Sequence, residues 1–188
     1  PVPVRRRYGC SRCRLDDDYP RLRERLAGFA REGNERFAEL APGGHAAHDD
    51  VVREAIHPAW LFGGTPWTSG VINNAGLLPY HRDAGNLRGS WSMMLGLKRG
   101  CDGGYLHLAD FDIWLAIPDH SLTCFDGQGV LHGVSPFHLA PRGYRYTIVL
   151  YAKTACRDCL EGDDEVRRAQ RRRTEAEERL ALLPGRGE

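Results

Sequence analysis

The sequence predicts a mainly β domain with flanking helices, an α+β fold, and three observations support this. The 188 residues are enough for one domain, and 41% hydrophobic with 27% charged residues is typical of a globular chain. The 22 glycines and 11 prolines imply many turns, which favours short strands over a helix bundle. From Thr68 onward, short apolar runs alternate with turn residues, as in an antiparallel sandwich or barrel.

Two helices are expected before the strands. Apolar residues recur at roughly helical spacing from Tyr19 to Leu40, although Gly33-Asn34 would split this helix in two. The segment Ala41-Pro-Gly-Gly44 ends it. Residues 46–61 form either a second short helix or an irregular segment, with Pro58 as a break.

Seven short runs are the candidate strands. They are Ser69–Ile72, Ser90–Leu97, Gly104–Leu108, Ile113–Ile117, Ser121–Phe125, Gly129–His132 and Tyr144–Tyr151. The last run is the strongest because β-branched and aromatic residues dominate it. A charged helix from about Asp163 to Leu183 follows, and Pro184-Gly185 ends it.

One domain is expected, in three segments: a helical segment 1–67, a β core 68–155, and 156–188 with the second cysteine pair and the charged helix. No run of 18 apolar residues exists and the first residues lack a secretory signal, so we expect an intracellular protein without a membrane span. We also expect a monomer. The net charge of +1 excludes a histone-like protein that binds by charge alone. Arginine-rich stretches at both ends still allow nucleic acid as a partner.

His81-Arg-Asp83 is the first half of a candidate metal site. Residues i and i+2 of a strand point to the same side, so His81 and Asp83 would face one cavity. His132 lies near the end of a later strand. Two imidazoles and one carboxylate form the facial triad of non-haem iron(II) enzymes, which leaves coordination positions open for a cosubstrate and dioxygen. A lone His-x-Asp also arises by chance.

Arg145-Tyr-Thr147 strengthens the iron hypothesis. Arg145 follows His132 across the turn Pro141-Arg-Gly143, and on an antiparallel hairpin it would lie beside that histidine. A guanidinium with a hydroxyl two residues on can hold a carboxylate by charge-assisted bonds, as the distal carboxylate of 2-oxoglutarate requires. Arg142, in the turn, is a rival that lacks the hydroxyl.

At this point the stretch from about Val71 to Lys153 resembles the 2-oxoglutarate/Fe(II) dioxygenases of the TET/JBP family. The residues that carry the resemblance are His81-Arg-Asp-Ala-Gly-Asn86, Gly103-Gly-Tyr-Leu106, Leu131-His-Gly-Val-Ser-Pro136 and Arg145-Tyr-Thr-Ile-Val-Leu-Tyr151. The resemblance implies a double-stranded β-helix (jelly-roll or cupin-like) core and oxidation of the methyl group of 5-methylcytosine in DNA to 5-hydroxymethylcytosine. Further cycles would give formyl or carboxyl products.

The resemblance also assigns substrate contacts. It implies that Asn86 hydrogen-bonds a flipped base and that Tyr151 stacks on it, which suits an amide and an aromatic ring. Lys153 stands where TET proteins have a histidine, and a lysine donates but does not accept. This departure leaves 5-methylcytosine and thymine both open as substrates.

Two alternatives of other kinds remain. A 2-oxoglutarate oxygenase acting on a protein side chain or a small molecule would share His81, Asp83, His132 and Arg145, but would have no use for basic ends. A cupin-like binding module without turnover would need neither the metal ligands nor the arginine.

The six cysteines include two Cys-x-x-Cys pairs, Cys10 with Cys13 and Cys156 with Cys159. Two such pairs match a structural Zn(II) site with four thiolates, which would clamp the N-terminal segment to the exit of the last strand. The alternative is four unligated thiols. A redox disulfide within either pair is less expected because no helix plainly starts there.

Overall fold

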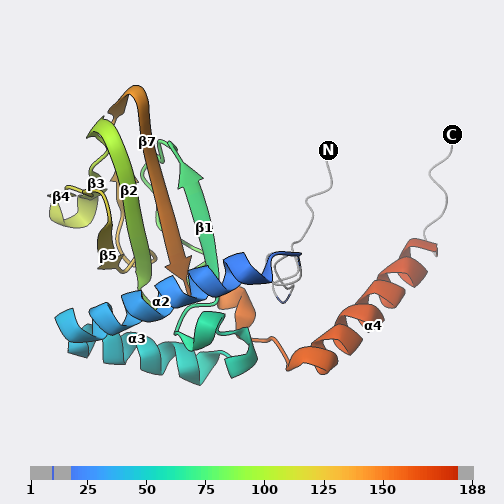
Figure 1. Cartoon of the computed structure of the whole chain (residues 1–188). Coiled ribbons are helices and arrows are strands. Elements are labelled where there is room, and N and C mark those ends of the chain that lie inside the picture. The colour runs from blue at the N-terminus through green and yellow to red at the C-terminus, as the bar shows by residue number, and fades with distance from the viewer. Residues whose placement is uncertain (1–9, 11–17, 182–188) are drawn as a thin grey trace, which may run out of the picture.

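The computed structural model describes residue 10 and residues 18–181, and the following statements refer to these. Two helices come first, α2 (Pro20–Leu40) and α3 (Pro42–Ala55), then two 3-10 turns, η1 (Pro58–Trp60) and η2 (Phe62–Gly64). Both helices lie across one end of the β region (Figure 1). No helix in this part of the chain combines the length and apolar composition needed to cross a membrane.

The strands form two antiparallel sheets. The four-stranded sheet has the order β1 (Ser69–Asn74), β7 (Phe137–Tyr151), β2 (Ser92–Gly103) and β5 (Ser121–Phe125). The three-stranded sheet has the order β4 (Ile113–Leu115), β3 (Leu106–Leu108) and β6 (His132–Val134). Between β3 and β4 lies the 3-10 turn η3 (Ala109–Phe111). The fold is therefore α+β with antiparallel sheets, as expected.

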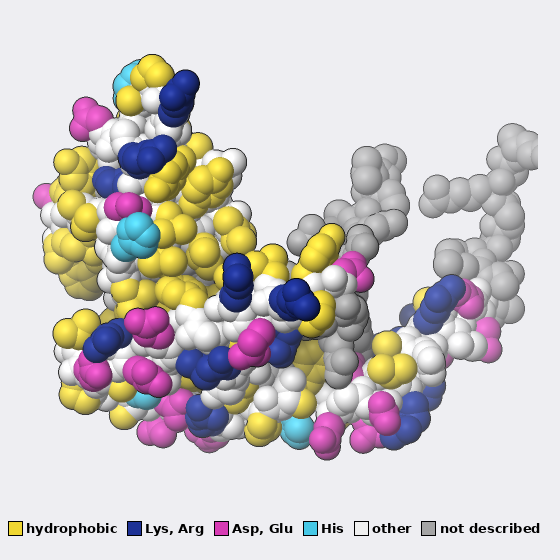
Figure 2. All heavy atoms as spheres, in the orientation of Figure 1, with side chains coloured by type: hydrophobic (Ala, Val, Ile, Leu, Met, Phe, Trp, Pro, Cys, Tyr) yellow, Lys and Arg dark blue, Asp and Glu magenta, His cyan; other side chains and the backbone are white. Residues whose placement is uncertain are grey.

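The two sheets face each other across a shared core. Met94 and Phe125 of the four-stranded sheet pack with Leu106 of the three-stranded sheet and with Ile117. A second cluster, which includes Phe37, Trp67, Met93 and Leu150, packs α2 against the opposite face of the four-stranded sheet. Figure 2 shows that hydrophobic side chains also gather on this face above α2.

The prediction that Gly33 would split the first helix is wrong. The helix α2 is continuous, and Gly33 is buried where a side chain at this position would collide with Met93 of β2. The glycine therefore allows close approach between helix and sheet. The next helix begins at Pro42, earlier than expected. Proline suits the first position of a helix because it lacks an N–H, and the N–H at this position would have no partner within the helix.

The strand boundaries differ from the prediction mainly after residue 128. The strand β6 begins at His132, where the predicted strand ended, and β7 includes the predicted turn. The turn remains as an irregularity within β7, where Arg142 has a positive φ and the register with β2 shifts. Arg145 therefore pairs with Lys98 of β2 and does not form a hairpin with His132. The two residues lie on different sheets.

The last elements are the 3-10 turn η4 (Thr154–Cys156) and the helix α4 (Gly162–Ala181). The helix α4 projects away from the sheets (Figure 1). Three of its arginines form ion pairs within the helix: Arg167 with Asp164, Arg168 with Glu165 and Arg173 with Glu177.

His48 of α3 is fully buried between the rings of Phe37 and Trp67. Its Nδ1 accepts a hydrogen bond from the backbone N–H of Trp91, at 3.0 Å. Burial and, to a smaller extent, the neighbouring His45 lower the pKa of His48 to about 4. A proton on Nδ1 would remove this acceptor, so the folded state keeps the imidazole neutral.

Acid is therefore expected to destabilise the fold through His48. Because its folded pKa lies below the ordinary 6.5, its contribution is complete above that pH and is lost as the pH falls toward 4. The loss in free energy of unfolding is about 3 kcal/mol at 1.36 kcal/mol per pKa unit. Urea unfolding between pH 7 and 4 measures it.

The matched comparison is His48→Gln, which cannot titrate, against His120→Gln at an exposed position. The wild type and His120→Gln are expected to lose stability more steeply than His48→Gln. Equal slopes in all three proteins would contradict this assignment.

Candidate metal and substrate site

Three side chains from two distant segments meet between the sheets. One potential ligand atom from each of His81, Asp83 and His132 lies within 4.8 Å of the other two. The imidazole centroids of the two histidines are 4.5 Å apart, and Asp83 Oδ1 lies 3.4 Å from His81 Nε2. Whether this cluster suits a metal ion depends on its donor atoms.

A pair of backbone hydrogen bonds brings the two histidines together. The N–H of His81 donates to the carbonyl of His132 at 2.9 Å, and the N–H of His132 donates back at 3.0 Å. This isolated bridge extends the three-stranded sheet beyond β6. The motif His81-Arg-Asp83 leaves the sheet at once, which differs from the predicted regular strand, and Asp83 is placed instead by its N–H on the carbonyl of Gly127.

Both imidazoles are oriented by carbonyls of their own chain segment. His81 Nδ1 lies 2.8 Å from the carbonyl of Pro79, and His132 Nδ1 lies 2.9 Å from that of Val130. A carbonyl only accepts, so each Nδ1 carries the proton and each Nε2 keeps a free lone pair. Metal-binding histidines are commonly oriented in this way. The donor set, two Nε2 atoms and one carboxylate, fits a divalent transition metal such as iron(II).

Asp83 is held by two neighbours. Its Oδ2 accepts a hydrogen bond from Asn86 Nδ2 at 3.2 Å, and the same nitrogen donates to Ser92 Oγ at 3.0 Å. Gly127 packs so closely that a side chain there would come within 2.5 Å of Asp83 Oδ2. Asn86, predicted to contact a base, therefore also positions a candidate metal ligand.

Arg145 is the second feature of the site. Its side chain is 4% exposed and lies over the ring of Phe137, 5.2 Å from the centroid. Among the described residues it forms no ion pair with an acidic group, and burial lowers its pKa. The rival Arg142 is exposed on the same strand. A buried guanidinium without a counter-charge is costly, so the site is suited to an anionic ligand.

Thr147 lies two residues further along β7, and its hydroxyl accepts a hydrogen bond from Asn73 of β1 at 3.1 Å. The hydroxyl proton stays available for a ligand because Asn73 supplies the proton in that bond.

One cavity of about 490 Å³ joins these groups. It contains all eight residues that the sequence assigned to iron, cosubstrate and base: His81, Asp83, Asn86, His132, Arg145, Thr147, Tyr151 and Lys153. Its other walls include Met94, Leu106 and Phe125. The pKa of Tyr151 is raised, first by burial and then by Asp83. The volume is within the range of small-molecule sites.

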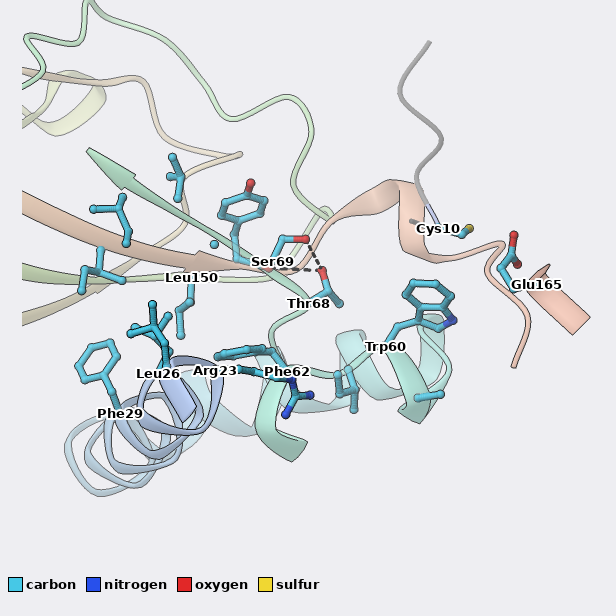
Figure 3. Close-up of a pocket in the computed structure, with 18 of the residues that line it drawn as sticks. Cys10, Arg23, Leu26, Phe29, Trp60, Phe62, Thr68, Ser69, Leu150 and Glu165 are labelled. Carbon is cyan, nitrogen blue, oxygen red and sulfur yellow. Dashed lines mark hydrogen bonds between the residues drawn. The ribbon is translucent and has the colours of Figure 1, made fainter. Parts of the chain in front are cut away.

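A larger cavity of about 810 Å³ lies elsewhere, between α2, η1, η2, β1 and the start of α4. Phe29, Leu26, Phe62 and Trp60 give it an apolar character (Figure 3). It contains none of the three clustered metal ligands, so the smaller cavity is the better candidate for chemistry.

The predicted zinc clamp needs correction. The structure joins Cys10 to Cys159 in a disulfide, and sulfurs that share a covalent bond are not the thiolates that zinc requires. Cys156 is buried in the same cluster and is not part of this disulfide, and burial raises its pKa. Cys13 lies outside the described residues. The expected link between the N-terminal segment and the exit of the last strand is present, but it is covalent.

Functional side chains that the sequence did not single out surround the motif. Ser92 receives the second hydrogen bond of Asn86, and Asp110 of η3 pairs with Arg82 at 2.9 Å. An isolated aspartate in a short connection carries no periodic signal. Neither partner is visible before the strands are placed.

Fold and site together define an α+β protein with antiparallel sheets and a candidate His-Asp-His metal centre. No protein-family model matches the chain, and no curated protein matches it in sequence. Among solved structures, the chain is similar to NgTET1 in complex with 5mC DNA, with a TM-score of 0.57 and 13% sequence identity. The match covers 74% of this chain and 55% of that chain, so this chain spans about half of NgTET1. At this identity the likeness shows the fold alone.

The cysteine chemistry gives a direct test. In denaturant without reductant, iodoacetamide is expected to label Cys101 and Cys124 and to spare Cys10 and Cys159. Peptide mapping by mass spectrometry should find the last two in one cross-linked peptide. Labelling of both residues, together with one zinc per native chain, would instead support the thiolate clamp.

Proposed function

We propose that the protein is a 2-oxoglutarate- and Fe(II)-dependent dioxygenase that oxidises the methyl group of 5-methylcytosine in DNA. One observation carries the proposal: a three-ligand cluster and a buried guanidinium without an acidic partner among the described residues share one cavity. Two imidazoles and a carboxylate leave coordination positions for outside ligands. A cosubstrate with a chelating keto acid at one end and a carboxylate at the other matches both features.

In this proposal His81, Asp83 and His132 hold Fe(II), and the bound metal would activate dioxygen. Arg145 binds the distal carboxylate of 2-oxoglutarate by charge-assisted hydrogen bonds, and the hydroxyl of Thr147 donates a hydrogen bond to the same carboxylate. The apolar walls exclude water from the reacting groups. The overall change is balanced: 2-oxoglutarate, dioxygen and a methyl group give succinate, carbon dioxide and a hydroxymethyl group.

The polar groups at the cavity support cytosine over thymine as the base. The amide nitrogen of Asn86 already donates to Asp83 and Ser92, so its carbonyl oxygen is the group left for a ligand. An acceptor there suits the 4-amino group of cytosine and repels the 4-oxo group of thymine. Lys153 would donate to an acceptor on the ring, and Tyr151 would stack on its face.

Two further features support the proposal. The facing antiparallel sheets are compatible with a double-stranded β-helix, and the structural neighbour NgTET1 was solved with 5mC DNA. The arginine-rich stretch of α4 supports DNA as partner, although Arg167 and Arg173 pair with acids of the same helix. Phosphates would have to compete with those acids.

The proposal predicts a specific product. Incubation of duplex DNA containing 5-methylcytosine with the protein, Fe(II), 2-oxoglutarate and dioxygen should yield 5-hydroxymethylcytosine, measured by nucleoside mass spectrometry after digestion. A parallel reaction on unmodified DNA should leave thymine unchanged, because its 4-oxo group faces an acceptor. Product from thymine alone would reverse the base assignment.

The matched control is His81→Ala, which removes one proposed ligand and should abolish product and succinate together. Succinate without any oxidised nucleoside in the wild-type reaction would retain the oxygenase and exclude this substrate. Turnover that survives His81→Ala would contradict the metal site.

Arg145 should govern cosubstrate binding. Arg145→Gln removes the charge, and since one hydrogen bond to a charged group contributes about 2 kcal/mol, the KM for 2-oxoglutarate should rise about 30-fold. Succinate formation at varied 2-oxoglutarate measures this. Arg142→Gln, on the same strand but exposed, should leave KM unchanged, and equal effects of the two substitutions would assign the carboxylate elsewhere.

A further inference from the structure

The two neighbours of His81 in sequence both reach the same piece of the three-stranded sheet. This piece, residues 106–115, comprises β3, η3 and β4 and supplies none of the three clustered ligands. Arg82 contacts Asp110 of η3, and Tyr80 contacts His107 of β3. The segment 106–115 therefore touches the metal motif from both sides of its first histidine.

The carboxylate that contacts Arg82 also contacts the segment that carries His132. Arg82 Nη2 lies 2.9 Å from Asp110 Oδ2, and the same carboxylate oxygen accepts the backbone N–H of Leu131 at 2.8 Å. Leu131 immediately precedes His132, and its carbonyl accepts the N–H of Ala109. Arg82 also donates to the carbonyl of Gly129. One carboxylate thus links the residue after His81 to the residue before His132.

The second contact runs through Tyr80. Its hydroxyl lies 2.6 Å from His107 Nδ1, and the imidazole of His107 stacks on Trp114 at 3.8 Å between centroids. The ring of Tyr80 also covers Gly133, where an added side chain would come within 2.9 Å of it. Tyr80 therefore packs against the strand that carries His132.

We propose that Asp110 is a positioning residue of the metal site, with Tyr80 and His107 in a supporting role. This inference rests on the proposed metal-dependent function. Asp110 is not among the residues that line the cavity, so any effect on metal binding has to pass through Arg82 and Leu131. Its carboxylate holds the residues next to His81 and His132 in place and so supports the backbone bridge between the two histidines, and a change in this support weakens the cluster as a whole. Outer partners of this kind typically change metal affinity by about 10- to 100-fold.

The test is the affinity for Mn(II), an oxygen-stable probe of the Fe(II) site, measured by titration with electron paramagnetic resonance detection of free ion. Asp110→Ala removes both contacts and should raise the Kd by about 10-fold or more. Asp110→Asn keeps an acceptor for Leu131 but loses the charge opposite Arg82, so its Kd should lie between those of the wild type and Asp110→Ala. This graded order is a readout that general loss of stability would not produce.

Asp119 provides a matched control. Its carboxylate also accepts a strand N–H, from Lys98 at 2.8 Å, and its side chain is 39% exposed against 34% for Asp110. Like Asp110 it does not line the cavity, but its partners Lys98 and His120 are not neighbours of His81 or His132 in sequence. Asp119→Ala should leave the Mn(II) Kd unchanged. Circular dichroism and thermal unfolding identify variants that are folded, and Asp110→Asn together with Tyr80→Phe keeps the test decisive if Asp110→Ala does not fold.

The outcomes separate this inference from the proposed function. Wild-type binding of Mn(II) that is lost in His81→Ala but unchanged in folded Asp110→Ala or Asp110→Asn would overturn the positioning role and leave the metal site intact. Wild-type protein that binds no Mn(II) would overturn both. A graded increase in Kd without oxidation of any DNA base would support the positioning role and exclude only the substrate.

Discussion

The site depends on the two backbone hydrogen bonds between His81 and His132. Neither residue lies in a long strand, and each imidazole reaches the cavity only because the bridge holds both segments in one antiparallel register. Since successive residues of a strand face opposite sides, a slip of one position would turn one of the two rings to the opposite face from the other. The contacts of Asp110 with Arg82 and Leu131, on either side of the bridge, therefore help to keep the two segments in this register.

The interior of the cavity is electrostatically uneven. The Oδ2 of Asp83 and the hydroxyl of Thr147 each accept a hydrogen bond from an asparagine, Asn86 three residues further on and Asn73 of the neighbouring strand. Arg145 is the exception, because its charge is buried against an aromatic ring. Low polarity strengthens hydrogen bonds and makes an uncompensated charge more costly. The fold thus accepts a local penalty at the position where an anion would relieve it.

Much of this arrangement could be predicted from the sequence, for identifiable reasons. Short sequence patterns identified the motif His81-Arg-Asp83, the later His132 and the strand from Tyr144. The site residues that were predicted from these patterns all line the cavity. The pairing of Arg145 with His132 was wrong because partner choice between strands depends on the whole topology.

Other misses have the same origin in contacts distant along the chain. Gly33 has the sequence character of a helix breaker, and only the side chain of Met93 shows that it serves packing. The disulfide between Cys10 and Cys159 joins two pairs that local spacing had grouped into one zinc site. Asp110 lies in a three-residue turn between two three-residue strands, too short for any periodicity.

The glycines that back the site have a consequence for how this protein can vary. Gly127 lies against Asp83, and Gly133 lies against the ring of Tyr80 and next to His132 in sequence. A Cβ added to Gly104 would lie 2.8 Å from Arg145 Nε. None of the three offers a functional group, yet even an alanine would displace a residue on which the site depends. Among the residues around the cavity, these three glycines should therefore tolerate substitution least, although they have no functional group.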